Sequence, residues 1–478
     1  MNTISSQNPF FETYSTLHST VPFDKIKTGD YVPAIREGIR RQNAEIEAII
    51  RNPEVPTFAN TVLAYEKSGE MLHRVSTVFG NLLSAETDDD LQELAKEIMP
   101  MMSEHENNIS LNEELFARIK AVYEQQDKET LSPEQHKLLE DIYNGFVRNG
   151  ANLLGEDKEK YRALCKELSL LTLQFSENNL KETNDYKLVI TDKSQLAGLP
   201  ESAVEAAAET AGEKGVEGWV FTLQAPSYGP FLTYADSRDL RRELYMAYNT
   251  KCTHDNASNN LEIVKKLANV RMEIAQLLGY DNFAEYNLQE RMAQNSESVY
   301  KLLDQLLEAY TPTAKQEYAE VQALARQAEG EDFVLMPWDW AYYSHKLKDR
   351  KFNIDDELLR PYFELNNVKQ GVFGLATRLY GITFKKNPDI PVYHKDVDAY
   401  EVFDKDGKFL AVFYTDFHPR AGKRSGAWMT SYKEQWIDEK TGENSRPHIS
   451  IVMNFTKPTQ DKPALLTFGE VETFQIGR

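Results

Sequence analysis

The 478-residue sequence predicts a mainly α-helical, multi-lobed protein that carries a small antiparallel β-sheet. Three observations support this fold class. Apolar residues recur at helical spacing over most of the chain, strand-like runs are few and gather in two places, and the length exceeds what one ordinary hydrophobic core needs. With 41% hydrophobic and 27% charged residues, the chain is expected to fold into a soluble globular protein.

Three apolar stripes are predicted to lie on helices and to face the core, because their steps of three and four residues place each set on one helix face. Gly279 follows the second stripe and is predicted to end that helix, while Asn295 or Ser296 is a capping candidate before the third. The stripes are Leu164, Leu168, Leu171 and Phe175; Val264, Leu267, Val270, Ile274 and Leu278; and Val299, Leu302, Leu303, Leu306 and Tyr310. We interpret all three as core, not as cofactor-binding faces.

The first strand signals lie near the middle of the chain. Residues 186–190 and 218–223 are short β-type runs that flank an alanine-rich helical stretch at 203–211. They predict two short strands around one helix.

The second group of strand signals lies near the end of the chain. Residues 401–403 and 409–414 flank Asp406-Gly407, a pair whose tolerance of positive φ suits a hairpin turn. A further strand is predicted at 448–455, where apolar and polar residues alternate. Its apolar side is predicted to be buried and its polar side open; the apolar side holds Ile449, Ile451, Met453 and Phe455, and the polar side holds His448, Ser450 and Asn454.

Charge and cysteine content exclude several function classes. The 54 basic and 75 acidic residues give a formal net charge of −21, which would repel nucleic-acid phosphates and anionic lipid. Cys165 and Cys252 are too few for a disulfide framework and have no metal-binding spacing. Neither a secretory signal nor a membrane-spanning apolar run is visible. We expect a cytoplasmic protein that binds neither nucleic acid nor membrane.

The last residues predict the beginning of a helix. Thr467 and Glu470 have the T-x-x-E spacing of a capping box, so a helix should begin at about Phe468. Phe468, Val471 and Phe474 are predicted to mark its inward face. Only a few residues follow before Arg478, fewer than the roughly 12 to 15 that an isolated helix needs for marginal stability. The helix is therefore expected to be incomplete.

Several segments resemble the thimet oligopeptidase and peptidyl-dipeptidase family of zinc metallopeptidases. The run at 422–429 is similar to the GKRxGAW segment of the family, and the runs at 454–458, 463–468 and 470–471 are similar to the stretch that precedes its HEFGH active-site helix. Further similar runs lie at 52–58, 146–153 and 352–355. The resemblance covers nearly the whole sequence and is closest to the bacterial peptidyl-dipeptidase branch. It implies a clam-like, multi-lobed helical body.

The resemblance also implies zinc-dependent hydrolysis of short peptides. In the family, the two histidines of H-E-x-x-H bind zinc, the adjacent glutamate activates the metal-bound water, and a further glutamate is the third ligand. At the matching positions this chain has Ile476 and Gly477, and none of its nine histidines lies four residues from another. His105-Glu106 matches only the first two residues of this motif, so His105 is expected to be an ordinary surface residue. We predict neither metal ligands nor catalytic residues within these 478 residues.

Gly426, Ala427 and Trp428 are the predicted substrate-binding residues. In zinc peptidases of this broad kind, an edge strand beside the metal pairs with the extended peptide, and the resemblance places these three residues there. The alternative is that small residues allow tight packing beside a core tryptophan. Both interpretations stay open.

Two other clusters have structural interpretations. Arg420, Lys423 and Arg424 form a basic cluster that could bind an anion, but we favour a solvated loop or internal salt bridges. The aromatic run at 338–343 could stack on a ligand, but we favour core or lobe contacts.

Three regions are predicted: an N-terminal helical region at 1–150, a central helical region with short strands at 151–330, and the start of a catalytic lobe, including the small sheet, at 331–478. The expected function is that of the N-terminal fragment of a zinc-dependent oligopeptidase or peptidyl-dipeptidase, monomeric and inactive by itself. The alternatives are a non-catalytic helical peptide-binding or scaffold protein, or one half of a split enzyme.

Overall fold

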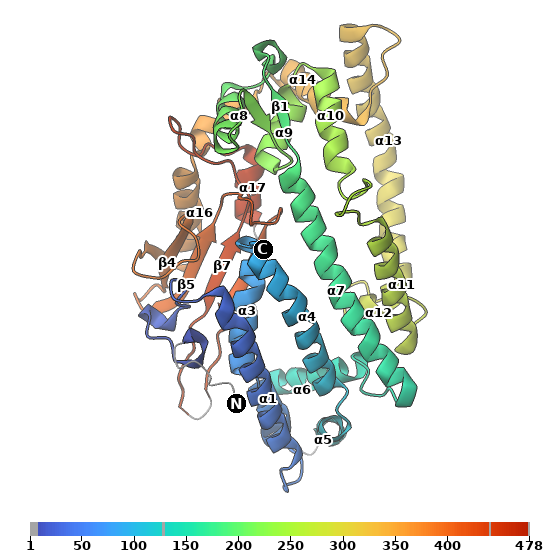
Figure 1. Ribbon diagram of the computed structural model, residues 1–478, viewed down its shortest axis with the longest axis vertical. Coiled ribbons are helices and arrows are strands. Elements are labelled where there is room, and N and C mark those ends of the chain that lie inside the picture. The colour runs from blue at the N-terminus through green and yellow to red at the C-terminus, as the bar shows by residue number, and fades with distance from the viewer. Residues whose placement is uncertain (1–7, 127–129, 439–440, 477–478) are drawn as a thin grey trace. The chain divides into compact units, whose positions relative to one another are not determined.

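The computed structural model describes residues 8–126, 130–438 and 441–476 and confirms a mainly helical fold (Figure 1). The longer helices are α1 Tyr31–Ile50, α3 Glu70–Ala85, α4 Asp89–Ser110, α5 Glu113–Tyr123, α6 Pro133–Arg148, α7 Gly155–Asp185, α8 Glu201–Glu213, α9 Ala225–Tyr234, α10 Arg238–Asn249, α11 Leu261–Leu277, α13 Ser296–Glu329, α14 Trp340–Phe352, α16 Leu365–Tyr380 and α17 Phe468–Ile476. Short helices are α2 Leu63–Glu66, α12 Phe283–Leu288 and α15 Asp356–Leu359. Within these described ranges, none of the helices has the length and apolar character that crossing a bilayer requires.

The chain divides into two compact units. The first comprises Met1–Glu177 and Asn260–Val299, and the second comprises Asn178–Asn259 and Tyr300–Arg478. Both α7 and α13 contain a boundary between the units. The three regions predicted from the sequence stay a prediction.

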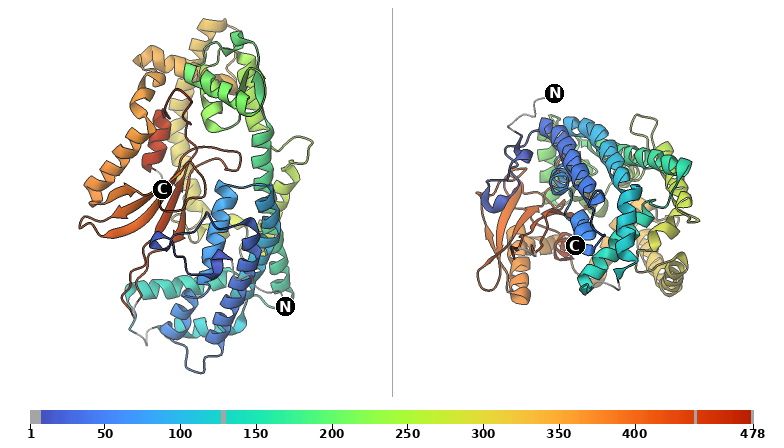
Figure 2. Two further views of the ribbon diagram at one scale, coloured as in Figure 1. Left: turned by 60° about the vertical axis from the view of Figure 1, so that its left-hand side comes forward. Right: turned by 90° about the horizontal axis from the view of Figure 1, so that it is seen from below.

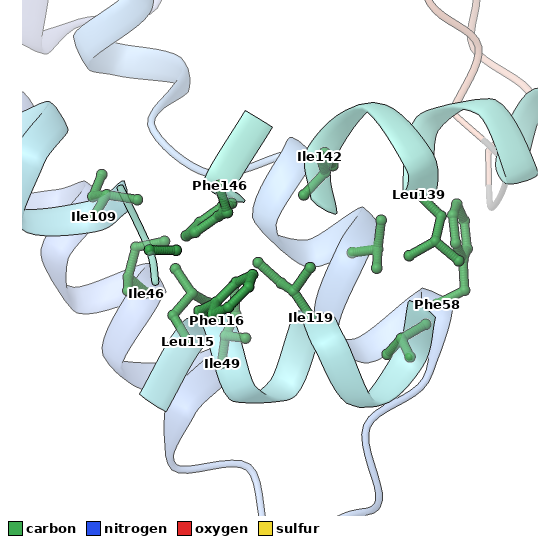
Figure 3. Close-up of a cluster of buried hydrophobic side chains, with 13 residues drawn as sticks. Ile46, Ile49, Phe58, Ile109, Leu115, Phe116, Ile119, Leu139, Ile142 and Phe146 are labelled. Carbon is green, nitrogen blue, oxygen red and sulfur yellow. The ribbon is translucent and has the colours of Figure 1, made fainter. Parts of the chain in front are cut away.

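The core of the first unit gathers apolar side chains from α1, α5, α6 and the π-helical turn Phe58–Val62 (Figure 3). Capping positions these helices. The Asn112 side chain accepts a hydrogen bond from Leu115 N at the start of α5, and Ser132 and Gln135 cap α6 reciprocally. Ten of the core side chains are labelled in Figure 3: Ile46, Ile49, Phe58, Ile109, Leu115, Phe116, Ile119, Leu139, Ile142 and Phe146.

The first two predicted stripes pack against each other in the first unit, on α7 and α11. Most of their members are buried, but Leu168 and Leu278 are partly buried, Phe175 is 37% exposed and Val264 is 49% exposed. Ile263 takes the buried place expected for Val264. Gly279 ends α11 as predicted: its φ is +86°, and the Tyr280 N–H bonds back to the Ala275 carbonyl.

The third predicted core stripe is wrong. On α13, Leu302 is 57% exposed, Leu303 52% and Tyr310 66%. The side chains that α13 buries, Val321 and Ala325, lie in its C-terminal half, where they pack with residues of α14. Helical spacing identifies residues that share a face, but it does not establish that a neighbouring element covers that face.

The middle strands form a two-stranded sheet in the second unit. Strands β1 (Leu188–Ile190) and β2 (Trp219–Phe221) pair antiparallel, with α8 between them in the chain as predicted. Gly218 precedes β2 with a φ of +100°, and a Cβ at this position would lie 2.2 Å from the Ile190 carbonyl oxygen. Only glycine allows this close approach. Leu244 of α10 packs in the core beneath the sheet and has no exposed surface.

A five-stranded sheet lies near the end of the chain, in the order β3-β4-β5-β7-β6. The strands are β3 Thr383–Lys386, β4 Val397–Phe403, β5 Phe409–Asp416, β6 Trp428–Lys433 and β7 His448–Val452. The predicted hairpin is β4–β5, and Gly407 in its turn has a φ of +75°. All neighbouring pairs are antiparallel except β5 and β7, which are parallel, a pairing that the sequence prediction did not include.

Helices α16 and α17 pack on one face of this sheet (Figures 1 and 2). Met453 and Phe455 point into that core, as predicted, and Ile451 packs at its margin. The predicted open side is wrong, because His448 is 2% exposed and Ser450 has no exposed surface. Alternation in a strand distinguishes its two faces, but here both faces are covered.

The burial differences can be tested with two leucines of the second unit. Leu244→Ala removes a fully buried side chain, so we expect the free energy of unfolding to fall by about 2 to 5 kcal/mol. Leu303→Ala truncates an exposed side chain of α13, so we expect a change within about 0.5 kcal/mol. Urea unfolding followed by circular dichroism measures both, and a comparable loss in Leu303→Ala would contradict the exposure of α13.

Candidate functional site

A buried carboxylate organises the loop that leads to β6. Asp416 ends β5 and has no exposed side-chain surface. Both of its oxygens accept hydrogen bonds from Arg420, at 2.8 and 2.7 Å. Lys423 Nζ donates to Asp416 Oδ1 at 2.8 Å, and the Tyr393 hydroxyl donates to Asp416 Oδ2 at 2.8 Å. This carboxylate is therefore bound by two cations and a phenol.

The hydrogen-bond donors of Lys423, like the acceptors of Asp416, all have partners. Its ammonium, which is fully buried, also donates to the main-chain carbonyls of Asp416 at 3.2 Å and His418 at 2.9 Å. An ammonium has three N–H donors, and all three have acceptors here. The loop from Asp416 to Lys423 is therefore closed by its own side chains.

The ionisation of this pair follows from burial and charge. Burial alone would raise the pKa of Asp416, but the hydrogen bond from Arg420 and the positive charges of Lys423 and Arg420 lower that pKa below its ordinary value. Burial lowers the pKa of Lys423 to about 8, although Asp416 acts in the opposite direction. At neutral pH the cluster holds one anion and two cations.

The loop after Lys423 is tied to the end of β7. Asn454 Nδ2 donates to the carbonyls of Arg424 at 3.1 Å and Gly426 at 2.8 Å. Gly426 has a φ of +101°, a conformation that favours glycine, and this places Ala427 on the approach to β6. Gly426 and Ala427 are exposed, and Trp428 is half-buried as the first residue of the strand.

Strand β6 lies at an edge of the sheet, with β7 as its one neighbour among the described strands. Met453 N donates to the Asp416 carbonyl at 2.7 Å, so the main chain of Met453 faces β5. Main-chain groups alternate along a strand, so Val452 faces β6, where it pairs with Trp428.

The same alternation turns the main-chain groups of Met429 toward the open edge, and extending it by one residue beyond the start of β6 gives the main-chain groups of Ala427 the same direction. Of the three predicted substrate-binding residues, Ala427 therefore presents its N–H and C=O outward. Trp428 uses its main chain with β7, and the Gly426 carbonyl is bound by Asn454. Met429 was missed by the sequence prediction, because its orientation depends on the register with β7.

The helix predicted at the end of the described chain is present as α17, and its capping box is formed. Glu470 N donates to Thr467 Oγ1 at 3.2 Å, and Thr467 N donates to Glu470 Oε2 at 2.7 Å. Glu470 also accepts from Thr456 N at 2.6 Å, which ties α17 to the segment after β7. Phe474 is buried as predicted, with Val471.

One member of the predicted inward face of α17 is wrong, because Phe468 is 58% exposed. Phe468 is the first residue of the helix. Gly477, where the family motif has its glutamate, lies outside the described residues, as does the side chain of Ile476, where the motif has its first histidine.

The structural interpretations of the other two clusters are confirmed. Arg420 and Lys423 form internal salt bridges with Asp416. In the aromatic run, Tyr342 and Tyr343 are buried in a core, and the fully buried Asp339 pairs with Arg241 at 3.0 Å and with Arg238. Arg424, the third member of the basic cluster, is exposed.

The described residues do not fit a zinc site, because they contain no group of three or more His, Cys, Asp or Glu side chains placed to hold a metal ion. His105, predicted to be a surface residue, is 3% exposed and lies 2.7 Å from Gln42 Oε1 through its Nε2. Burial lowers the pKa of His105. The prediction failed because polar neighbours in sequence do not exclude a buried position on an amphipathic helix.

Comparison with known proteins identifies the class. The Escherichia coli dipeptidyl carboxypeptidase is 39% identical over 473 residues, which cover 98% of this chain and 69% of that protein. Oligopeptidase A of the same organism is 33% identical over 456 residues, which cover 95% of this chain and 67% of that protein. The relatives are therefore peptidases, and this chain spans about two thirds of their length.

The family assignment follows directly. The family description "Peptidase family M3" matches residues 231–475, and together with these identities it shows that the chain belongs to peptidase family M3. The solved structure of PZ peptidase A with inhibitor 2 aligns with a TM-score of 0.48 and 16% identity, over 93% of this chain and 61% of that one.

Asp416→Asn tests whether the buried carboxylate holds this region together. The substitution leaves two cations beside a neutral amide, so we expect the free energy of unfolding to fall by roughly 3 to 5 kcal/mol in urea titrations. The exposed Asp461→Asn is the control and should stay within about 0.5 kcal/mol.

The same variant has an expected pH signature. Because folding lowers the pKa of Asp416, its stabilisation is complete above the ordinary carboxyl pKa of about 4 and is lost as the pH falls through the folded-state value. The stability gap between the native protein and Asp416→Asn should therefore narrow below about pH 4. A gap that does not change with pH would refute the ion-pair explanation.

Proposed function

We propose that this chain supplies the substrate-binding wall of a peptidase that hydrolyses short peptides. Family membership supports the reaction class, and the dipeptidyl carboxypeptidase and oligopeptidase A relatives support peptides as substrates. The observation that carries the proposal is the open main-chain edge at Ala427 and Met429, next to a loop closed by Asp416. An extended peptide binds such an edge through main-chain hydrogen bonds, which give affinity without demanding a particular sequence.

Gly426, Ala427 and Trp428 have different parts in this proposal. Gly426 allows the turn that brings the chain to the edge. Ala427 pairs with the peptide main chain, together with Met429. Trp428 begins β6 and pairs with Val452 of β7. A cytoplasmic location and a monomeric state belong to the same proposal.

Met429→Pro tests the edge. Proline removes an N–H that faces away from β7, so the sheet keeps its internal hydrogen bonds while the peptide loses one donor. We expect the Kd of an N-terminally labelled hexapeptide, measured by fluorescence anisotropy, to rise roughly tenfold. Met429→Ala keeps the N–H and is the matched control. Equal Kd values for Met429→Pro and the native protein would contradict the proposal that the peptide binds at this edge.

We propose further that these 478 residues neither bind zinc one-to-one nor cleave peptides by themselves. Peptidases of family M3 are zinc-dependent in general. The chain has no two histidines four residues apart, and the described residues offer no metal site. We expect metal analysis after dialysis against zinc to find well below about one ion per chain, and a quenched fluorogenic peptide to stay intact. Tight stoichiometric zinc uptake would overturn this proposal.

Two rival functions make different predictions. A scaffold or binding protein would bind peptide and stay inactive in every mixture. One half of a split enzyme would become active, with zinc, when a separate polypeptide carrying the H-E-x-x-H motif is added. Mixing the chain with such a polypeptide and measuring peptide cleavage distinguishes the two.

A further inference from the structure

Arg424 differs from the other two members of the basic cluster. Arg420 and Lys423 are bound to Asp416, whereas the Arg424 side chain is exposed and its guanidinium lies over the Trp428 ring, with 4.5 Å between the guanidinium carbon and the ring centroid. In the part of the chain that the structure describes, no salt bridge includes Arg424. Among the described residues Arg424 therefore has no carboxylate partner, although the protein has a net charge of −21.

The position of Arg424 along the edge is fixed by its main chain. Its carbonyl and that of Gly426 share the Asn454 amide, and its guanidinium packs on the first residue of β6. Stacking on an indole ring holds a guanidinium in place and reduces the side-chain entropy lost on binding an anion. Arg424 therefore presents a positioned cation at the N-terminal end of β6.

The direction of a bound peptide decides which of its ends lies near this cation. Antiparallel pairing is commoner and slightly more stable than parallel pairing. A peptide antiparallel to β6 has its C-terminal residues beside Trp428 and Ala427. Each further residue advances roughly 3.3 Å along the edge. A carboxylate one or two residues beyond the pair at Ala427 therefore comes within reach of the Arg424 side chain.

We propose that Arg424 binds the free C-terminal carboxylate of the peptide and is a specificity-determining residue of this site. The planar guanidinium matches a carboxylate with two parallel N–H···O bonds, stronger than neutral hydrogen bonds. The preferred ligands are short peptides with a free α-carboxylate, bound with that end toward Arg424. This inference rests on the proposed function, because it requires a peptide on the β6 edge.

The test compares two peptides that differ only at the C-terminus. One N-terminally labelled hexapeptide ends in a free acid and the other in an amide, and fluorescence anisotropy gives the Kd of each for the 478-residue chain. We expect the amide to bind roughly tenfold more weakly to the native protein. In Arg424→Gln the acid should lose that advantage while the Kd of the amide stays unchanged, and Arg424→Lys should restore part of it.

Arg242→Gln is the matched control, because Arg242 is also exposed and also lies over a tryptophan, Trp338, at 5.4 Å. It should leave both Kd values unchanged. If the native protein binds the acid and the amide with equal Kd, the role of Arg424 is overturned and the edge proposal stands. The same conclusion follows if Arg424→Gln weakens the binding of both peptides equally. If neither peptide binds, the edge proposal fails and the role of Arg424 fails with it.

Discussion

The local architecture of the candidate site depends on the burial of Asp416. An isolated carboxylate could not be placed at the end of a central strand, because the loss of hydration would exceed anything that packing returns. Arg420, Lys423 and Tyr393 make the burial possible by satisfying both oxygens. The carboxylate, through Arg420 and Lys423, ties together the loop from Asp416 to Lys423. A hydrophobic substitute could fill the space, but it would not specify where each part of the loop lies.

The polar side of β7 has the same explanation. His448 and Ser450 are buried because they share the face of the sheet that carries Asp416, and that face is covered. The other face of the sheet is an ordinary apolar core under α16 and α17. The sheet thus has buried polar side chains on one face and buried apolar side chains on the other. The apolar face contributes hydrophobic stabilisation, and the polar face contributes a defined geometry next to the open edge.

The sequence patterns predicted helices, caps and turns more accurately than they predicted which side chains are buried. Helical spacing, the capping box at Thr467 and the turn at Gly407 were correct because each depends on neighbours within a few residues. The errors at Leu303, His448 and His105 all concern burial, which depends on elements distant in the chain. For the same reason, the candidate site was located at 426–428 through resemblance, while the outward direction of Met429 was not foreseen. That direction follows from the pairing of β6 with β7, which no local pattern records.

Asp416 links the two features on which the proposed peptide site depends. Its carbonyl accepts the Met453 N–H, which sets the main chain of β7 and, through pairing, turns Met429 outward. Its side chain binds Lys423, the residue next to Arg424. The hydrogen-bonding edge and the cation at its end are thus positioned by one residue, from its main chain and from its side chain. A change that moved one of them independently would have to break a fully buried interaction, so their spacing is protected by the same free energy that keeps the carboxylate out of water.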